Sequence, residues 1–592
     1  MLPFLTLLSC APSEPSKPTD DSGADDTDTD AVDTGPDNDG DGWGNLVDCD
    51  DADATVHPSA AEHCDDRDED CDGVADDYAV DWVSFWRDDD SDGWGGTAGS
   101  FLGCDAPAGF AAEPGDCDDA DATIHPTARD VRGDGVDQDC DGADAEDLCA
   151  AATPVAGDWR LTGPTAADTA AALCAAGLVR VTGEVEVAAT PFTDLSALSC
   201  LCAAEGGLSI HDNATLTSLD GLDYLASLGG SVGLELRDNP VLVSLDGLYW
   251  LTTATALHLE TNSALASLRP LAGTTMTGSV VIETEPAIAS LDGLLVADTL
   301  TELTIYDCGA LASLDGVAGL GRITGALEIE ENAALASLSG FEGLTQVGSL
   351  RFSGNDALHD LRGLDGLATV DGRFDLRRTA LTSLDGLGSL THVGALSIAD
   401  DAALPDLQGL GPVSDIGDLS VSSTNLQSFA GFEGSAVTGS LTLLENPLLV
   451  SLAGADAVAE LSELSVSDND ALQSVDLPAL QRVSGDVLIT GNDALTSLAG
   501  LAALSTVGAL ELTDNDTLVT FDGLDAMRTV GGTLRIELHD ALADVTALHG
   551  LTSVGASLYI RYNPVLASAD AEALERAIDS IGGGSRVSDN GP

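Results

Sequence analysis

A single repeat dominates the C-terminal three quarters of this chain of 592 residues. The second aliphatic residue of a Leu-x-aliphatic pair recurs sixteen times between Ile210 and Ile560, at intervals of about 23 residues, and earlier members stand at Leu161 and Val187. A unit of this length with one or two short strands cannot bury its apolar side alone and must stack on its neighbours. The sequence therefore predicts a mainly β solenoid of about 18 coils.

A typical unit spans residues 486–508 and contains a pair of alternating aliphatic residues, four spaced leucines and a closing glycine. In ten of the sixteen coils an asparagine follows the second aliphatic residue by three positions. An inward asparagine can bond backbone groups left unpaired at each turn and can also pair along the stack. These asparagines are Asn213, Asn239, Asn262, Asn332, Asn355, Asn446, Asn469, Asn492, Asn515 and Asn563.

The glycines that close the coils, such as Gly485 and Gly508, mark turns with a positive φ or a close approach of two backbones. Cys308 occupies the asparagine position of its coil, and we interpret it as a buried thiol rather than a reactive one.

The Leu-x-Ile-x-x-Asn-x-x-Leu-x-Ser-Leu-x-Gly-Leu strings resemble receptor L domains, right-handed β-helical relatives of leucine-rich repeats. The resemblance covers residues 149–566 and implies a right-handed β-helix or leucine-rich-repeat-like solenoid. Cys149 and Cys174 stand where that family caps its first coil. Residues 567–592 are expected to form a C-terminal cap and tail, with an amphipathic helix over 569–581.

Residues 37–148 form an acidic module with two copies of one pattern. The string Asp-x-Asp-x-Asp-Gly occurs four times, beginning at Asp37, Asp68, Asp88 and Asp137; we call these the first to fourth Asp loops. Calcium takes six to eight oxygen ligands, and carboxylates at alternate positions of a tight loop converge while a glycine at position six permits the turn. The sequence therefore predicts calcium sites.

The first Asp loop fits the 12-residue calcium pattern best, with Asp48 at the closing position and the Trp43 carbonyl at position seven. The other three loops have Ala79, Gly99 and Leu148 at position 12, so their remaining ligands must come from neighbours such as Asp76, Asp147 or the segments around Asp50 and Asp118. The candidate metal ligands are Asp37, Asp39, Asp41, Trp43, Asp48, Asp50, Asp68, Asp70, Asp72, Asp88, Asp90, Asp92, Asp118, Asp137, Asp139 and Asp141.

The chain has 12 cysteines, ten of them from Cys49 to Cys202, a density that in an exported chain implies disulfides. The six in the acidic module allow 15 pairings, all of which stay open. Gly133 stands opposite Cys64 in the second copy, so the disulfides of the two copies are expected to differ. The cysteines expected in disulfides are Cys49, Cys64, Cys71, Cys104, Cys117, Cys140, Cys149 and Cys174.

The acidic module resembles the tandem MopE-type metal-binding motif of bacterial surface proteins, and its aspartate pattern is similar to thrombospondin type 3 calcium repeats. The MopE resemblance raises copper as an alternative to calcium, because His57 and His125 occupy equivalent places and imidazole suits copper. Two histidines among dozens of carboxylates nevertheless favour calcium. A zinc site is not supported, because no Cys/His ligand set has zinc-finger spacing.

The first ten residues, MLPFLTLLSC, resemble the lipobox of bacterial lipoproteins, in which the cysteine is lipidated; here that is Cys10. The resemblance implies a signal over 1–10 and a protein at the outer membrane or cell surface, lipid-anchored or secreted. Residues 11–36 are rich in Pro, Asp, Thr and Ser and predict a disordered acidic tether. No later stretch reaches the roughly 18 apolar residues of a membrane span, so we expect membrane attachment by the lipid alone.

The chain has 101 acidic and 21 basic residues and a formal charge of −80. This excludes a nucleic-acid surface, which needs a basic patch, and like-charge repulsion predicts a monomer. We find no Gly-x-Ser-x-Gly, His-Glu-x-x-His, phosphate-binding or dinucleotide motif. The solenoid acids, such as Asp220 and Asp246, recur in one Ser-Leu-Asp-Gly position, which indicates turn chemistry rather than an active centre. We therefore expect no enzyme.

The sequence favours a non-enzymatic surface lipoprotein that binds calcium through its Asp loops and presents the solenoid to an unknown protein or glycan partner. A copper-binding surface protein is one alternative. A β-helical polysaccharide-active enzyme is another, because carboxylates on one outer face of a parallel β-helix can support such chemistry.

Overall fold

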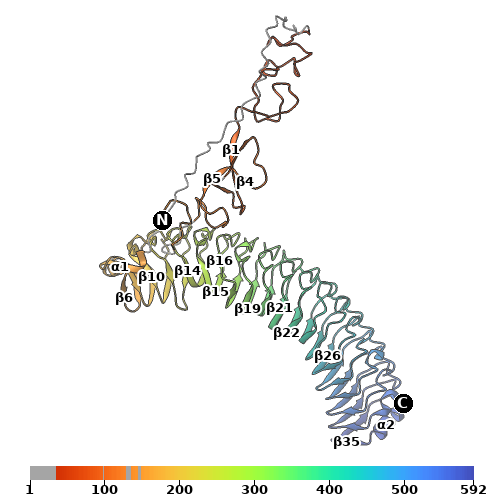
Figure 1. Ribbon diagram of the computed structural model, residues 1–592. Coiled ribbons are helices and arrows are strands. Elements are labelled where there is room, and N and C mark those ends of the chain that lie inside the picture. Colours follow the sequence, from red (N-terminus) through yellow and green to blue (C-terminus); the bar gives the residue numbers. More distant parts are fainter. Residues whose placement is uncertain (1–34, 98, 129–134, 145–147) are drawn as a thin grey trace, which may run out of the picture. The chain divides into compact units, whose positions relative to one another are not determined.

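The computed structural model describes residues 35–592 except 98, 129–134 and 145–147. The expected signal, Cys10, most of the tether, Gly133 and Asp147 lie outside these residues. The chain separates into two compact units, residues 1–145 and 146–592 (Figure 1). No helix in the described part of the chain is both long enough and apolar enough to span a bilayer.

The first unit consists mostly of turns and loops, with five short strands in its second half. Strand β1 pairs antiparallel with β3 and β4, while β2 pairs parallel with β5. These strands are β1 (Val83–Arg87), β2 (Trp94–Gly96), β3 (Ser100–Gly103), β4 (Phe110–Ala111) and β5 (Glu113–Asp116).

The second unit is a parallel β solenoid that carries one short α-helix near each end. The α-helices are α1 (Ala166–Cys174) and α2 (Ser568–Ala577). The 3-10 helices are η1 (Leu148–Ala151), η2 (Gly163–Thr165), η3 (Ser196–Leu198), η4 (Arg269–Leu271), η5 (Asp315–Val317), η6 (Ala499–Leu501) and η7 (Thr546–Gly550).

The strands of the first half are β6 (Thr153–Val155), β7 (Trp159–Thr162), β8 (Val179–Val181), β9 (Glu184–Ala188), β10 (Leu201–Ala204), β11 (Gly207–His211), β12 (Ser227–Leu228), β13 (Leu234–Arg237), β14 (Thr253–Glu260), β15 (Thr275–Glu283), β16 (Leu295–Val296), β17 (Thr299–Leu300), β18 (Glu302–Tyr306), β19 (Arg322–Glu330), β20 (Gln346–Ser353) and β21 (Thr369–Arg377). The strands of the second half are β22 (His392–Ala399), β23 (Asp415–Ser422), β24 (Ser440–Leu444), β25 (Glu460–Leu461), β26 (Glu463–Ser467), β27 (Arg482–Val483), β28 (Val487–Thr490), β29 (Thr506–Val507), β30 (Leu510–Thr513), β31 (Thr529–Val530), β32 (Leu534–Glu537), β33 (Ser553–Val554), β34 (Leu558–Arg561), β35 (Ser580–Ile581) and β36 (Ser585–Ser588).

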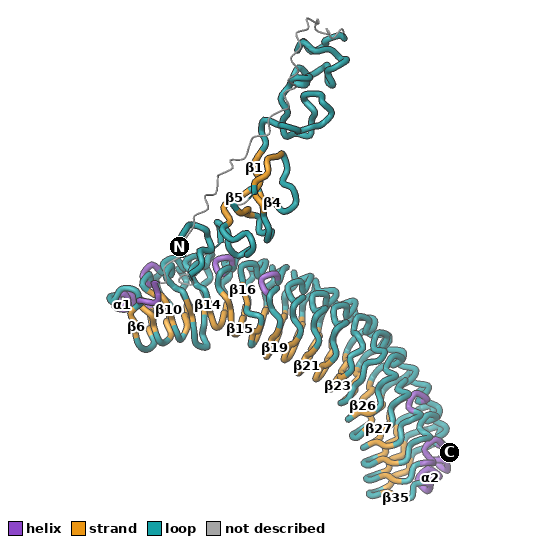
Figure 2. Tube along the Cα trace, in the orientation of Figure 1, coloured by secondary structure: helices purple, strands orange, loops and turns teal. Residues whose placement is uncertain are grey.

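One parallel sheet of 25 strands runs the length of the solenoid, and its main strands follow chain order from coil to coil. Figure 2 shows these strands along the inner side of the curved solenoid, with turns and loops along the outer side. A second parallel sheet, β25-β27-β29-β31-β33-β35, forms in the last coils. In some earlier coils one long strand, such as β19 or β21, takes the place of the two short strands, and its pairing shifts register partway along.

The apolar repeat forms the core, as predicted. In the unit 486–508, Val487 and Ile489 are fully buried, as are the four leucines that follow. Ile489 is in register with Val466 of the preceding coil and Leu512 of the next. Each inward position therefore stacks on its equivalents, and the predicted mainly β, leucine-rich-repeat-like solenoid is confirmed.

The predicted number of coils is slightly low, because the chain continues the sheet beyond α2. The C-terminal helix ends at Ala577 rather than residue 581, and Ile578 is buried. Strand β35 then joins the second sheet and β36 pairs with β34. The segment expected to be a tail is therefore a further coil.

A ladder of buried side chains follows the predicted asparagine positions, and all ten asparagines have no exposed surface. The Asn469 Nδ2 donates to the Leu443 carbonyl of the preceding coil at 3.1 Å and to Asn492 Oδ1 of the next at 3.2 Å. The Asn469 backbone N–H also donates to Asn492 Oδ1. Asn469 thus connects three coils while it satisfies buried backbone groups. The ladder also includes Asn590, which the sequence reading missed.

Seven coils carry another residue in the ladder, and most of these residues reproduce part of the amide's bonding. The His539 ring pairs Nδ1 with the Asn515 N–H and Nε2 with the Leu512 carbonyl, and burial lowers its pKa, which keeps the ring neutral. Cys308 is a free, fully buried thiol as predicted, and burial raises its pKa to about 12. The seven are Thr190, Glu285, Cys308, Thr379, Asp401, Thr424 and His539.

Two of these ladder residues are buried acids. The Glu285 Oε1 accepts hydrogen bonds from Asn262 N–H and Nδ2, at 2.9 and 2.8 Å. The Asp401 Oδ1 accepts from Thr379 N–H and Oγ1. The second oxygen of each carboxyl is buried without a partner among the described residues, at the place where the asparagines carry a donor. Desolvation raises the pKa of Glu285 to about 7 and that of Asp401 to about 6.

Backbone contact and turn chemistry account for the other repeated positions. A Cβ on Gly508 would meet the carbonyl oxygen of Gly485 in the preceding coil, so close approach rather than positive φ requires glycine there. In the Ser-Leu-Asp-Gly string, the Ser244 Oγ accepts from the Asp246 N–H at 3.0 Å. This turn recurs along the array and agrees with a structural role for those acids.

The disulfides at the start of the solenoid differ from the expected cap. Cys149 and Cys174 do not pair with each other: Cys149 pairs with Cys202 and Cys174 pairs with Cys200. Helix α1 covers the end of the core, where Leu173 is buried. The two bonds therefore fasten the capping segments to strand β10 and its approach, one coil further along.

Replacing the buried ladder acids by amides should stabilise the solenoid above neutral pH. The folded state prefers neutral Glu285 and Asp401, so stability is lost as the pH rises from their ordinary pKa toward about 7 and about 6. Glu285→Gln and Asp401→Asn should each add about 3 kcal/mol at pH 8. The melting temperature of the full chain between pH 5 and 8 is the measurement.

The exposed neighbour Asp400 supplies the control: its charge is a minor cause of the raised pKa of Asp401, so Asp400→Asn should give a smaller gain than Asp401→Asn. A wild-type melting temperature that does not fall between pH 5 and 8, or equal gains from Asp400→Asn, would contradict a protonated ladder.

Candidate metal centre

Three aspartates of the first Asp loop each use one carboxylate oxygen to hold the loop backbone, whereas Asp37 uses both. The Asp39 Oδ1 accepts from the Asp41 N–H at 3.2 Å, and the Asp41 Oδ1 accepts from the Trp43 N–H at 2.8 Å. Asp48 is buried, and its Oδ1 accepts from the Asp50 N–H at 2.9 Å. The Oδ2 atoms of Asp39, Asp41 and Asp48 are buried and have no partner among the described residues.

The third Asp loop repeats this arrangement with a different closing acid. Asp90 and Asp92 accept from backbone N–H groups two residues on, as Asp39 and Asp41 do. Asp116 is 2% exposed, and its Oδ1 accepts from the Asp118 N–H at 2.8 Å. The Oδ2 atoms of Asp90, Asp92 and Asp116 are again buried without partners in the described chain.

Strand pairing brings Asp116 to the third loop. Strand β2 begins at Trp94, directly after the loop, and pairs in parallel with β5, where Gly96 is opposite Asp116. A Cβ on Gly96 would lie 3.0 Å from the Asp119 side chain, so a glycine permits this approach. In the first loop, by contrast, the corresponding acid Asp48 follows eleven residues after Asp37.

Both loops gather carboxylates into the geometry that a hard cation requires. Within each group, donor oxygens of three aspartates lie within 4.8 Å of one another. Buried carboxylate oxygens without hydrogen-bond donors are costly, and a divalent cation supplies the missing positive charge and coordination. The residues present therefore fit a calcium-type ion. The two groups are Asp37, Asp39 and Asp41, and Asp88, Asp90 and Asp92.

The second Asp loop adds two acids that the sequence reading did not assign. Glu62 is 3% exposed and lies with Asp68 and Asp70, while Asp77 lies with Asp70 and Asp72. The Glu62 Oε1 accepts from the Asp70 N–H at 2.7 Å. The closing acid at position ten of this loop is thus Asp77.

The fourth Asp loop has the backbone turn of the second. Asp137 accepts from the N–H groups of Asp141 and Gly142, and the Asp139 Oδ1 accepts from the Asp141 N–H at 3.1 Å. All four predicted Asp-x-Asp-x-Asp-Gly strings therefore form similar aspartate turns.

Three predicted or possible ligands have other contacts. The Asp50 carboxylate is 3.1 Å from Arg67 Nη2, and Asp118, its counterpart in the second copy, is exposed. Asp76 accepts from the N–H groups of residues 65 and 66, so Asp77 rather than Asp76 joins the second loop. The Trp43 carbonyl stays a predicted ligand.

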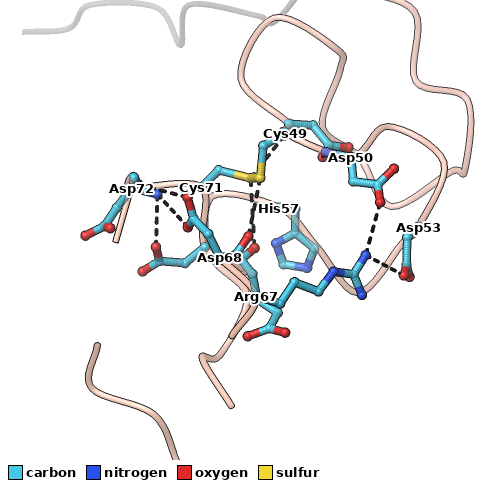
Figure 3. Close-up of a disulfide and its surroundings, with 12 residues drawn as sticks. Cys49, Asp50, Asp53, His57, Arg67, Asp68, Cys71 and Asp72 are labelled. Carbon is cyan, nitrogen blue, oxygen red and sulfur yellow. Dashed lines mark hydrogen bonds and ion pairs between the residues drawn. A yellow bond between two sulfur atoms is a disulfide. The ribbon is translucent and has the colours of Figure 1, made fainter. Parts of the chain in front are cut away.

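Disulfides join the loops in pairs. Cys49 directly follows the closing acid Asp48, and it is bonded to Cys71 inside the second Asp loop. Figure 3 shows this bond beside Arg67, which pairs with Asp50 and Asp53. Cys117–Cys140 repeats the connection in the second copy, and Cys64–Cys104 links the two copies. Each copy therefore has one equivalent disulfide. The copies differ at Cys64, as expected because the second copy has no cysteine at the equivalent position.

Without a cation, the carboxylates destabilise one another's charged forms. Desolvation, followed by the charges of neighbouring aspartates, raises the pKa of Asp39, Asp90 and Asp116. Asp53 lies outside the loops, and hydrogen bonds from Thr55 and Arg67 lower its pKa to about 2. The raised pKa values of Asp39, Asp90 and Asp116 thus belong to carboxyl groups of the two candidate sites.

The two histidines have matching structural contacts. The ring of His57 stacks on Trp43 with centroids 6.4 Å apart, and that of His125 stacks on Trp94 at 6.2 Å. The His57 Nδ1 accepts from the Ser59 N–H, and the backbone N–H of His57 donates to the Glu69 carbonyl. These contacts fix each ring at a turn.

Comparison with known proteins supports a metal-binding module. The model of the Cu-binding MopE family, described as a “Putative metal-binding motif”, matches residues 48–77 and 116–146. Both matches begin at a closing acid, Asp48 or Asp116, and include the second or fourth Asp loop. No curated protein sequence is detectably similar to the chain.

Two solved structures give partial matches. The functional domain of InlJ from Listeria monocytogenes, whose title notes a cysteine ladder, is 16% identical, with 58% of this chain and 71% of that chain covered and a TM-score of 0.21. The TLR13–ssRNA13 complex is 13% identical, with 65% and 79% covered and a TM-score of 0.16.

Removing carboxylates from the third loop should remove one cation site. We expect Asp90→Asn with Asp92→Asn to lower the calcium stoichiometry of the full chain by one, measured by equilibrium dialysis. With a Kd of roughly 0.1 mM, as in extracellular modules, a site in about 10 mM calcium adds about 2.7 kcal/mol to the stability of the first unit. Chelation should lower that unit's melting temperature in the wild type and less in the variant.

The exposed Asp105 provides a charge-matched control: Asp105→Asn should leave stoichiometry and melting unchanged. Because protons compete for the same oxygens, the stabilisation by calcium should also weaken as the pH falls. An unchanged melting temperature on chelation would show that these loops hold no stabilising cation.

Proposed function

We propose that this protein is a non-enzymatic cell-surface lipoprotein that binds calcium through its Asp loops and presents the solenoid for recognition of a protein or glycan. The observation that carries the metal assignment is the pair of equivalent sites, each with three buried carboxylate oxygens that lack partners among the described residues. The family match to a metal-binding motif supports the same module.

Calcium suits these sites better than a softer metal. Every side chain that the first and third loops direct together is a carboxylate, and calcium prefers oxygen ligands in flexible loops. When bound, the ion would neutralise Asp39, Asp41 and Asp48, and their counterparts in the third loop, which otherwise repel one another. The loops, with their disulfides, would then form a rigid module.

The recognition role rests on the form of the second unit. A solenoid of this kind offers a long surface of outward side chains from successive strands, and repeat proteins use such extended surfaces for binding. Five disulfides in the described chain fit an oxidising compartment outside the cytoplasm. Attachment through lipidated Cys10 would place this surface outside the membrane.

Copper is the second candidate, because the matched family model carries a copper-binding name. The residues it would use are His57 and His125, which occupy equivalent places in the two copies. Imidazole binds copper well, but one histidine per copy offers few nitrogen ligands.

A parallel titration separates the two metals. We expect the full chain to bind calcium with the same stoichiometry and affinity in the wild type and in the His57→Ala, His125→Ala double variant, because carboxylates hold the ion. His63→Ala, an exposed histidine of the same unit, serves as the control. Metal content after dialysis against each ion, measured by mass spectrometry, is the readout.

Stoichiometric copper binding that disappears in the double variant, together with indifference to calcium, would overturn the calcium assignment. For the surface assignment, Cys10→Ser should release the protein from the membrane fraction. Retention of that variant in the membrane would exclude a lipid anchor at Cys10.

A further inference from the structure

Arginines are concentrated in one part of the solenoid. Five of the chain's 20 arginines fall within the 28 residues from 351 to 378, in a chain whose net charge is −80. Random placement would put about one there. The five are Arg351, Arg362, Arg373, Arg377 and Arg378.

Four of these arginines lie on one face of neighbouring strands. On β21, Arg373 and Arg377 point outward and alternate with Phe374 and Leu376, which are fully buried. Arg351 of β20 is in register with Asp375 of β21. The side chains therefore meet on the strand side of the solenoid, the inner side of the curve in Figure 2.

These arginines line a hollow, here named the arginine hollow, with a volume of about 460 Å³. This volume falls within the roughly 300–1,000 Å³ of small-molecule sites. Every side chain of its lining is polar or charged, and four guanidinium groups face two carboxylates. The lining residues are Glu330, Arg351, Ser353, Arg373, Asp375, Arg377 and Arg378.

A buried carboxylate orients part of the arginine hollow. Asp375 is 8% exposed at its side chain; its Oδ1 accepts from Arg373 Nη2 at 3.2 Å, and its Oδ2 is 3.8 Å from Arg351 Nε. The Arg351 Nη1 also donates to Glu330 Oε1 at 3.3 Å. Both arginine side chains remain about half exposed. Their guanidinium groups are therefore fixed in position and still have N–H donors free to bind a ligand.

Small hydroxyl side chains complete the support. The Arg373 Nη2 donates to Ser397 Oγ at 3.0 Å, and the Arg378 Nη2 donates to Ser353 Oγ at 3.2 Å. Arg378 also pairs with Glu331 at 2.9 Å. Arg377 differs, because its exposed side chain has no hydrogen bond or ion pair with the described residues.

We propose that the arginine hollow binds a sugar acid, with the ligand's carboxylate on the guanidinium groups of Arg373 and Arg377 and its hydroxyls on the neighbouring acids and serines. The inference deepens the proposed function, on whose recognition role it rests, by naming the ligand class. Planar guanidinium groups suit a carboxylate because they can donate two parallel hydrogen bonds to it.

The composition of the lining selects this ligand among anions and sugars. An apolar ligand finds no apolar side chain in the hollow. A long polyanion would extend onto the acidic coils nearby, where Glu328 and Asp418 occupy outward strand positions, and repulsion within a Debye length of about 8 Å would oppose it. A simple anion offers no donor to the carboxylate oxygens of Glu330 and Asp375, whereas sugar hydroxyls can donate to them.

A titration of the full chain tests the assignment. The probes are a glucuronate-terminated disaccharide, the matching neutral glucose disaccharide and inorganic phosphate, each followed by calorimetry and by ligand-observed NMR in calcium-containing buffer. We expect the acidic disaccharide alone to bind well. Arg377→Gln should weaken it by roughly tenfold or more, because a charge-assisted pair is lost.

Arg362→Gln is the matched control, because Arg362 belongs to the coil of Arg351 but lies outside the hollow and pairs with Asp360 and Asp385. It removes the same charge and should leave the affinity unchanged. Equal losses in both variants, or equal binding of phosphate, would overturn the sugar-acid site in favour of general charge attraction.

Absence of binding to the acidic disaccharide would also overturn the inference. Calcium stoichiometry measured on the same samples keeps the two proposals separate. If calcium binds normally and the disaccharide does not, only the ligand assignment fails. If calcium does not bind but the disaccharide does, the metal assignment fails and the arginine hollow stands.

Discussion

The stability of the solenoid depends on hydrogen bonds to the backbone N–H and C=O groups that face its water-free interior. Every turn beneath the strand leaves N–H and C=O groups that cannot reach water. A ladder side chain solves this when it both accepts from and donates to neighbouring coils: the Asn469 Oδ1 accepts from the Asn446 N–H, and its Nδ2 donates to the Leu443 carbonyl and to Asn492 Oδ1. The imidazole of His539 also provides one acceptor and one donor, both for the preceding coil. Because most asparagine rungs contact both neighbouring coils, the ladder also fixes the stacking register and, with it, the regular spacing of the strands.

Much of this fold could be predicted because its information is local and repeated. The 23-residue period, the aliphatic pair and the asparagine three residues later identify each coil without knowledge of any other. The last coil was missed because the helix before it interrupts the period, although Asn590 stands three residues after Val587 as the rule requires. The cysteine pairs of the cap could not be derived, because they depend on how α1 folds over the end of the core and on which coil it reaches.

In the metal loops, too, the features that depend on neighbouring residues could be predicted, and those that depend on distant residues could not. The turns of the Asp-x-Asp-x-Asp-Gly strings follow from sequence because each aspartate bonds a backbone N–H two residues later. The closing acid is not local in the third loop: Asp116 arrives through the pairing of β2 with β5. Its only signal in the sequence is the alignment of Asp-Cys-Asp-Asp at 48–51 with the same string at 116–119. Asp50 stays a predicted ligand, but no local pattern shows that Arg67, 17 residues away, pairs with it.

The regular stacking also decides which surface charges need an explanation. Outward residues in register lie about 4.8 Å apart on adjacent strands, and like charges at that distance repel by roughly 1 kcal/mol even in water. A strongly acidic array therefore benefits from interposed arginines, and Arg351, between Glu328 and Asp375 in one outward column, meets that need. Arg373 and Arg378 likewise have carboxylate partners. Arg377 does not: its register neighbours are Ser353 and Ala399, so charge neutralisation within the array gives no reason for it. Arg377 thus has no role in the charge balance of the solenoid, and it lies beside oriented guanidinium groups and small side chains. Binding of a ligand would explain its presence.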